Sequence, residues 1–136
     1  MELVDTSVWA QRRNPAVAPW FDAALLRDQI TLCDQILLEL LMYPVRSEDF
    51  DRLAYVLTAV PLTPMTAADW VRAREVQALL AHQRRGQHKS VKIPDLLIAA
   101  TAERAGLTLV HYDQDYELIG TATGQTQRWV VERGTV

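Results

Sequence analysis

Acidic side chains are the residues of this sequence that could carry out chemistry, and position singles out a few of its 17 acids. Asp5 directly follows a short apolar run, and Asp113 directly follows a longer one near the other end of the chain, with Asp115 two residues further on. If both runs are strands of a parallel sheet, these acids lie at the carboxyl ends of strands, where such sheets bind ligands. The structural alternatives are a helix N-cap for Asp5 and a turn for Asp113 and Asp115.

Two further acids lie in apolar helical patterns. Glu39 stands within residues 36–42, where every other side chain is apolar, and no Lys or Arg lies three or four residues away. Burial of a lone carboxylate is costly unless it is paired, protonated or bound to a metal. Asp95 opens the apolar stretch 94–102 and is expected to face the edge of the sheet. The alternatives are a solvent-exposed seam or a distant arginine for Glu39, and stabilisation by the helix dipole for Asp95.

All these acids can converge at one end of one sheet. Clustered carboxylates repel one another, so such a site requires hard cations among them. A set of ligands made only of oxygen suits Mg²⁺ or Mn²⁺ better than zinc or copper. These metals activate water and stabilise the charge that develops on a phosphodiester during in-line attack. The acids therefore predict a metal-dependent hydrolase of phosphodiesters.

The elements that must position these acids alternate along the chain. Short strands are expected over Glu2–Val4, Ile30–Cys33, Leu107–Tyr112 and Trp129–Val131. Helices are expected over Pro15–Arg27, Gln35–Tyr43, Ser47–Ala59, Thr66–Arg84 and Pro94–Ala105, with one further turn over Tyr116–Ile119. This alternation predicts an α/β fold with a mainly parallel sheet covered by helices on both faces. We expect residues 1–136 to form one domain, because no linker or repeat interrupts them.

One stretch, residues 84–92, is polar, basic and without periodicity, and it is expected to be an exposed loop. It is either a solvated connection or a contact for the backbone of a substrate. In the second case the cations that would contact the substrate are Arg84, Arg85, Lys89 and Lys92.

Composition and missing motifs narrow the class of protein. The formal charge of −3 argues against binding of nucleic acid through a broad basic surface, although metal bound by acids reverses the local sign. There is no phosphate-binding GxxxxGK[ST] or GxGxxG loop and no GxSxG motif, and the three histidines lack the spacing of zinc ligands. The single cysteine, Cys33, is expected to be a buried thiol. No apolar run approaches a membrane span, and with no secretory signal we expect the protein in the cytoplasm.

The ordered set of acidic segments resembles the PIN-domain endoribonucleases, and in length the chain looks most like VapC toxins of VapBC toxin–antitoxin pairs. The segments that carry this resemblance are Asp5–Trp9, Glu39, Pro94–Ala102 and His111–Glu117. The resemblance implies a three-layer α/β/α fold and an endoribonuclease that depends on Mg²⁺ or Mn²⁺. It also implies a homodimer and a VapB-like antitoxin that occupies the active-site groove. The expected substrate is a single-stranded or loop region of RNA, tRNA included.

The resemblance also assigns roles to residues. Asp5, Glu39 and Asp95 would be metal ligands, and Thr6 or Ser7 would hold Asp5 or a metal-bound water by a hydrogen bond. Both acids of the last segment are candidates for the fourth position. We favour Asp113, which is nearer the end of the strand, with Asp115 as a second ligand or a positioning group.

Two other functions are weighed against the nuclease. A non-catalytic PIN-like module that binds proteins would have no reason to keep mutually repelling carboxylates. A metal-dependent phosphatase would need paired aspartates after the first strand, whereas this chain has Asp5 followed by Thr6 and Ser7.

Overall fold

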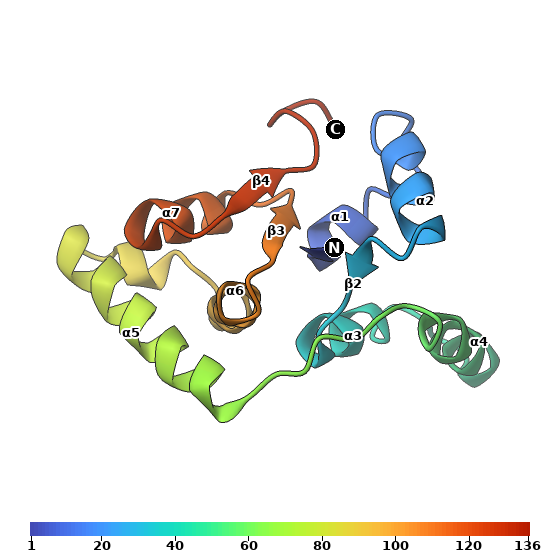
Figure 1. The fold of residues 1–136 in the computed structure, drawn as a ribbon, viewed down its shortest axis with the longest axis horizontal. Coiled ribbons are helices and arrows are strands. Elements are labelled where there is room, and N and C mark those ends of the chain that lie inside the picture. Colours follow the sequence, from blue (N-terminus) through green and yellow to red (C-terminus); the bar gives the residue numbers. More distant parts are fainter.

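The computed structural model describes residues 1–136, which form a four-stranded sheet and seven α-helices (Figure 1). The strands are β1 (Glu2–Val4), β2 (Ile30–Thr31), β3 (Thr108–His111) and β4 (Gln127–Trp129). The α-helices are α1 (Thr6–Trp9), α2 (Ala18–Leu26), α3 (Asp34–Leu40), α4 (Ser47–Leu57), α5 (Ala67–Gln83), α6 (Ile93–Arg104) and α7 (Gln114–Thr123). A short 3₁₀ helix, η1 (Gln87–Lys89), lies between α5 and α6. None of the helices combines the length and the hydrophobicity that crossing a membrane requires.

The sheet has the strand order β2-β1-β3-β4, and every pairing in it is parallel. The chain moves from β1 outward to β2, then crosses back past β1 to β3 and on to β4. Because parallel connections are right-handed, these opposite directions place the connecting helices on opposite faces of the sheet. Accordingly, α1 and α2 lie on one side, and α5, α6 and α7 lie on the other (Figure 1). The predicted three-layer α/β/α fold with a mainly parallel sheet is confirmed.

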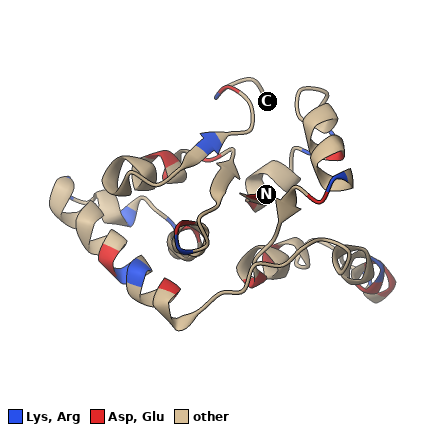
Figure 2. Ribbon diagram, in the orientation of Figure 1, with Lys and Arg blue, Asp and Glu red and all other residues tan.

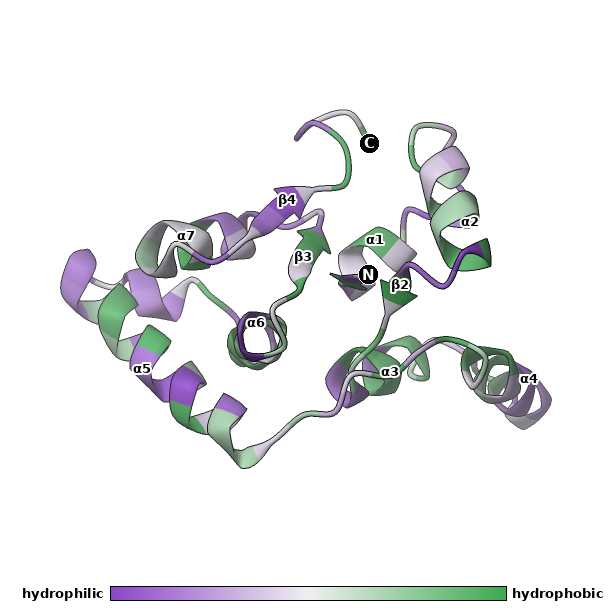
Figure 3. Cartoon of the chain, viewed as in Figure 1, coloured by the Kyte–Doolittle hydropathy of each residue, from purple (hydrophilic) through white to green (hydrophobic).

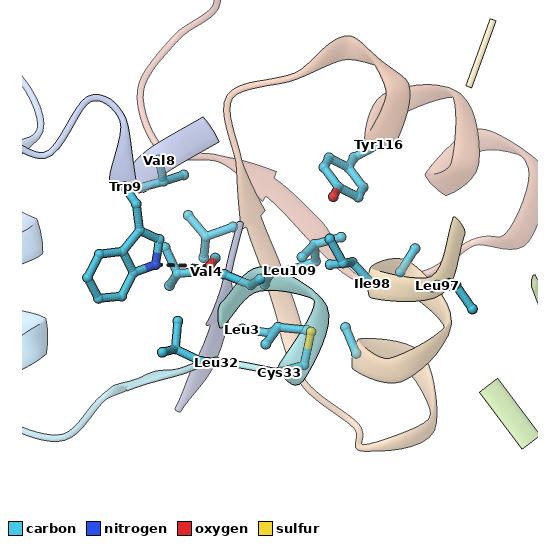
Figure 4. Close-up of a cluster of buried hydrophobic side chains, with 14 of the residues drawn as sticks. Leu3, Val4, Val8, Trp9, Leu32, Cys33, Leu97, Ile98, Leu109 and Tyr116 are labelled. Atoms are coloured by element: carbon cyan, nitrogen blue, oxygen red, sulfur yellow. Dashed lines mark hydrogen bonds between the residues drawn. The ribbon is translucent and has the colours of Figure 1, made fainter. Parts of the chain in front are cut away.

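The core surrounds the two central strands. Leu3 and Val4 of β1 and Leu109 of β3 are at most 1% exposed, and α6 is buried along Leu96–Ala102. The indole N–H of Trp9 donates a hydrogen bond to the carbonyl of Val4 at 3.2 Å, which satisfies the one polar atom of that side chain (Figure 4). Hydrophobic residues accordingly concentrate in β3 and α6, while β4 is hydrophilic (Figure 3).

An ion pair connects the edge strand β4 to β1. Two guanidinium nitrogens of Arg128 donate to the carboxylate of Glu2, at 2.9 and 2.8 Å. The same guanidinium group lies 4.8 Å from the centre of the Trp20 ring. Charged residues are absent from β3 and gather instead on the outer elements (Figure 2).

A second ion pair joins α5 to α6. Asp69 is 1% exposed and accepts hydrogen bonds from Arg104 at 2.6 Å, from Thr101 and from the backbone of Thr66, the N-cap of α5. Burial opposes ionisation of Asp69, but these donors outweigh it and hold the pKa of the carboxyl below its usual value.

Several elements differ from the sequence-based prediction. Helix α7 extends over ten residues where one turn was expected, and β4 begins two residues before the expected Trp129. Residues 84–92 are only partly an exposed loop, because they contain η1 and the buried Val91. Helix α3 is apolar on nearly every side but is not buried on every side, since Leu38 is 64% exposed. The prediction of a buried Cys33 is confirmed, and burial raises the pKa of its thiol to about 11.

Candidate active site

Two neighbouring strands end side by side, and the acidic residues gather where they end. Val4, the last residue of β1, pairs in register with Val110 of β3, and the N–H of Asp5 donates to the carbonyl of Val110 at 2.9 Å. Asp5 therefore leaves β1 next to the end of β3. Asp5 is also the N-cap of α1. It therefore has the capping role that the sequence offered as an alternative, and it also lies at the acidic cluster.

Ser7 fixes one oxygen of Asp5. Oδ2 of Asp5 accepts from the backbone N–H of Ser7 at 2.9 Å and from its hydroxyl at 2.6 Å. The same hydroxyl accepts from the backbone N–H of Tyr112 at 2.9 Å. Ser7 thus holds the carboxylate in one orientation and ties the start of α1 to the end of β3.

The hydroxyl group of Tyr116 contacts two of the predicted acids. Its side chain is 1% exposed, and its hydroxyl lies 2.7 Å from Oδ1 of Asp5 and 3.1 Å from Oδ1 of Asp95. This tyrosine comes from the first turn of α7, and Figure 4 shows its ring beside Ile98 of α6. A phenol has one hydrogen, so it can donate to only one of the two carboxyl groups.

Three aspartates form the tightest part of the site. Asp95, Asp113 and Asp115 each offer one carboxylate oxygen, and these oxygens lie within 4.8 Å of one another. Asp95 lies in the first turn of α6, directly after Pro94, which suits the start of a helix. Asp113 is the N-cap of α7 and accepts from the N–H of Asp115 at 3.0 Å. Asp95 and Asp115 are buried, and the side chain of Asp113 is 24% exposed.

The ammonium group of Lys92 lies among these three aspartates. Nζ is 2.9 Å from Asp113 Oδ2, 3.0 Å from Asp115 Oδ2 and 3.4 Å from Asp95 Oδ2. Partial burial disfavours its charge, but the carboxylates outweigh burial and hold the pKa of Lys92 above its usual value. Lys92 therefore does not lie in an open basic loop as the sequence suggested, but within the acidic site.

The protonation of the buried aspartates follows from their surroundings. Burial is the main cause that raises the pKa of Asp95, and a hydrogen bond to Asp115 and the charge of Asp5 act in the same direction. Burial also opposes ionisation of Asp115, yet its hydrogen bonds to Asp95 and Lys92 lower its pKa. These surroundings therefore favour a proton on Asp95 over one on Asp115.

Glu39 approaches the same site from α3. Its side chain is half-buried and 3.5 Å from the amide nitrogen of Gln35, the only polar contact within its own helix. Burial raises the pKa of Glu39 first, and the negative charge of Asp5 raises it further. No salt bridge neutralises it, so the alternative of a distant arginine partner does not hold.

The donor set fits a hard divalent cation. Two buried oxygen atoms, Oγ1 of Thr6 and Oδ2 of Asp95, accept no hydrogen bond, although the ammonium group of Lys92 lies 3.4 Å from Oδ2 of Asp95. Buried polar atoms are normally satisfied, so unpartnered oxygens beside a carboxylate cluster are what a cation would contact. Every candidate ligand is an oxygen, as Mg²⁺ and Mn²⁺ prefer.

The structure thus brings together all the acids that the sequence singled out, and it separates the basic residues. Only Lys92 forms ion pairs with these acids, while Arg84, Arg85 and Lys89 lie on the preceding segment after α5. His111 is fully buried and pairs with Gln127. Sequence reasoning missed Tyr116, because nothing in the sequence distinguishes it from an ordinary core tyrosine.

The arrangement of acids agrees with a known family. The PIN domain family matches residues 3–121 of the chain. The chain belongs to the PIN domain family. This PIN domain is 44% identical over 133 residues to Ribonuclease VapC18 of Mycobacterium tuberculosis, a match that covers 98% of this chain and 97% of the relative. It is 41% identical over 141 residues to Ribonuclease VapC51 of the same organism, with 98% and 96% of the two chains covered.

Solved structures confirm the fold of this PIN domain. A chain of DNA-bound VapBC from Salmonella typhimurium superposes with a TM-score of 0.73, covering 96% of this chain and 100% of that chain at 17% identity. At this identity the likeness shows a common fold, while the family membership rests on the closer relatives.

Proposed function

We propose that this protein is a Mg²⁺- or Mn²⁺-dependent endoribonuclease that acts as the toxin of a type II toxin–antitoxin pair. Its substrate would be single-stranded or loop regions of RNA, tRNA among them. One observation carries the proposal: Asp5, Glu39, Asp95, Asp113 and Asp115 converge where β1 and β3 end, in a chain 44% identical to a protein named as a ribonuclease. A module that only binds proteins gains nothing from this repulsive cluster.

The carboxylates of Asp5, Asp95, Asp113 and Asp115, with Glu39 beside them, would hold the metal. When bound, the cation supplies an activated water and neutralises charge on the phosphodiester. The protein contributes orientation, which for such reactions accounts for much of the rate.

Three other side chains prepare this site. Ser7 keeps Oδ2 of Asp5 in one position, and Tyr116 spans Asp5 and Asp95, so the two carboxyl groups remain at a fixed separation. Lys92, whose side chain is 62% exposed, would place a positive charge where the phosphate of the substrate arrives.

The proposed VapB-like antitoxin has a suitable surface beside the site. A groove of about 630 Å³ lies between α2, α3 and α4, and nine of its eleven lining residues are hydrophobic, Trp9, Phe21 and Tyr43 among them. Leu40 lines it and directly follows Glu39 on α3, so the groove lies close to one acid of the site. An arginine at that point of the antitoxin would pair with the carboxylates and block the site.

We further propose that the protein forms a homodimer and acts in the cytoplasm. Support for the dimer comes from two large apolar side chains on one shallow hollow between α5 and α6: Trp70 is 56% exposed and Ile93 is 64% exposed. Apolar surface of this kind commonly marks a protein interface. Sedimentation equilibrium of the purified protein would test this state directly.

Cleavage of RNA by the purified protein tests the enzymatic proposal. We expect cleavage with Mg²⁺ or Mn²⁺, none with EDTA, and none for Asp95→Asn. The matched control is Asp51→Asn, because Asp51 is an exposed acid on α4, remote from the cluster. Failure of the wild-type protein to cleave any RNA with either metal would instead favour a non-catalytic module.

Growth of a host that expresses the protein tests the toxin assignment. We expect arrested growth without a partner and normal growth when the cognate antitoxin is co-expressed. Harmless expression of a protein that cleaves RNA in vitro would rule out the toxin role and leave the nuclease.

A further inference from the structure

A polar cleft with three arginines lies beside the acidic site. It is formed between the segment after α5 and helix α7, which lie next to each other in Figure 1, and has a volume of about 580 Å³. Ten residues line it, and only Leu118 among them is hydrophobic. Arg84, Arg85 and Arg133 supply its charge.

The positive charge of this cleft is mostly unneutralised. Arg84 and Arg85 are exposed, and neither forms a salt bridge. Arg133 donates to the side-chain oxygen of Gln114 at 2.7 Å and lies 4.0 Å from Glu117, the one acid in the lining. Three arginines and one glutamate leave the cleft with a surplus of two positive charges, in a protein whose net charge is −3.

The backbone holds the first two arginines in place. Gly86 follows them with a φ of 77°, a left-handed conformation that glycine adopts without strain, and the chain then turns into η1. The hydroxyl of Ser90 caps this turn by donating to the carbonyl of Gln87, and the buried Val91 anchors its end. The arginines therefore stand on a defined turn.

The cleft adjoins the acidic site through the chain itself. Gln114, which lines the cleft, stands between Asp113 and Asp115, and adjacent Cα atoms are only about 3.8 Å apart. On the opposite wall, Ser90 precedes Lys92 by two residues. Both walls of the cleft therefore continue directly into the acidic site.

We propose that this cleft binds the phosphodiester backbone of the RNA substrate on one side of the bond that is cut; this rests on the ribonuclease function proposed above. The cluster of carboxylates repels RNA, so productive binding requires cations nearby. Guanidinium groups suit this task, because their planar donors match two phosphate oxygens at once. An almost wholly polar lining favours a hydrated, charged strand over an apolar peptide.

The test measures binding without cleavage. The parent protein is Asp95→Asn with Mg²⁺, and the probe is a fluorescein-labelled single-stranded RNA titrated at several KCl concentrations. In this background, Arg84→Gln with Arg85→Gln removes two charges from the cleft. The matched control is Arg27→Gln, because Arg27 is an exposed arginine at the end of α2, outside the cleft.

The double variant should reduce the dependence of log Kd on log salt by about 1.4, which is about 0.7 for each lost phosphate contact on a single strand. This change in slope corresponds to a Kd about 25-fold higher than that of the parent near 0.1 M salt. The Arg27→Gln control should have the same Kd and salt dependence as the parent. Arg84→Lys with Arg85→Lys keeps the charge and should retain most of the binding. This lysine variant separates loss of charge from any disturbance of the turn.

The outcomes distinguish the two proposals. If the wild-type protein cleaves RNA but the glutamine variant binds RNA with the Kd and salt dependence of the control, the cleft is not an RNA site and the nuclease stands. The same conclusion follows if the variant loses binding to the antitoxin alone. If the wild-type protein neither binds nor cleaves RNA, both proposals fail.

Discussion

The hydroxyl of Tyr116 lies 2.7 Å from Oδ1 of Asp5, although 111 positions separate the two residues in the chain. This contact fixes α7 against the start of α1 beneath the acidic cluster. A buried phenol that carries no charge of its own can hold two carboxyl groups close together without adding to their repulsion.

Replacement of Tyr116 by phenylalanine should therefore lower both the stability of the fold and the affinity of the site for Mg²⁺. The buried oxygens of Asp5 and Asp95 lose a partner, so we expect unfolding to become easier by about 1–3 kcal/mol. Urea denaturation and Mg²⁺ titration calorimetry measure the two effects. Unchanged stability with unchanged metal affinity would show that the hydroxyl does not hold these carboxylates.

Asp95→Asn should separate folding from metal binding. Burial and neighbouring carboxylates raise the pKa of Asp95, so the metal-free fold gains nothing from its charge at neutral pH. We expect the metal-free variant to melt no lower than the wild type, and the rise of Tm with Mg²⁺ to be blunted. An acid that only stabilised the helix dipole would behave differently, costing about 0.3–1 kcal/mol when removed.

The fourth acidic position can be assigned by two substitutions. We expect Asp113→Asn to lose more cleavage than Asp115→Asn, with Asp113 as the primary ligand. Asparagine is as good an N-cap as aspartate, so α7 should remain intact. Equal losses would mean that both carboxylates bind metal. The reverse order would place the ligand at Asp115, the more deeply buried of the two.

Lys92→Gln should strengthen Mg²⁺ binding and weaken the metal-free fold. The ammonium and a divalent cation would contact the same oxygens of Asp95, Asp113 and Asp115, so they compete. Loss of a charged hydrogen-bond partner should lower metal-free stability by about 1–3 kcal/mol. Lys89→Gln is the control, because Lys89 is an exposed lysine three residues earlier. Weaker Mg²⁺ binding by Lys92→Gln would show that Lys92 organises the ligands instead of competing.

Acid should remove the stabilisation that Asp69 gives to the contact between α5 and α6. Its folded pKa lies below the usual 3.8, so its contribution is complete above that value and is lost as pH falls through the folded pKa. Asp69→Asn should cost about 1.5–3 kcal/mol at pH 7 because Arg104 loses its partner, and the difference from wild type should shrink below about pH 4. Denaturation curves at several pH values provide the measurement. A difference that persists undiminished in acid would mean that packing, not charge, is responsible.

Sequence reasoning placed the acids well because strand ends and apolar helices leave clear patterns. Asp5 and Asp113 each follow an apolar run, and parallel strands end at one edge. Helix α7 was underestimated because Gly120 and its threonines are weak helix formers, which packing of Tyr116 and Ile119 into the core overrides.

The contacts of Lys92 and Tyr116 could not be predicted in the same way. Tyr116 reaches Asp5 only because β1 and β3 are adjacent, a tertiary fact with no local signature. Lys92 precedes Asp95 by three residues, which hints at one ion pair, but its contacts with Asp113 and Asp115 depend on how α7 docks.

The separation of Ser7 from Tyr112, and of Asp5 from Tyr116, has a consequence for protein synthesis. Asp5 and Ser7 are translated long before Tyr112 and Tyr116, the residues that connect them to β3 and α7. A growing chain that stops before Tyr116 carries all five acids of the cluster but lacks the hydroxyl that links Asp5 to Asp95. The site can therefore assemble only after α7 has been translated.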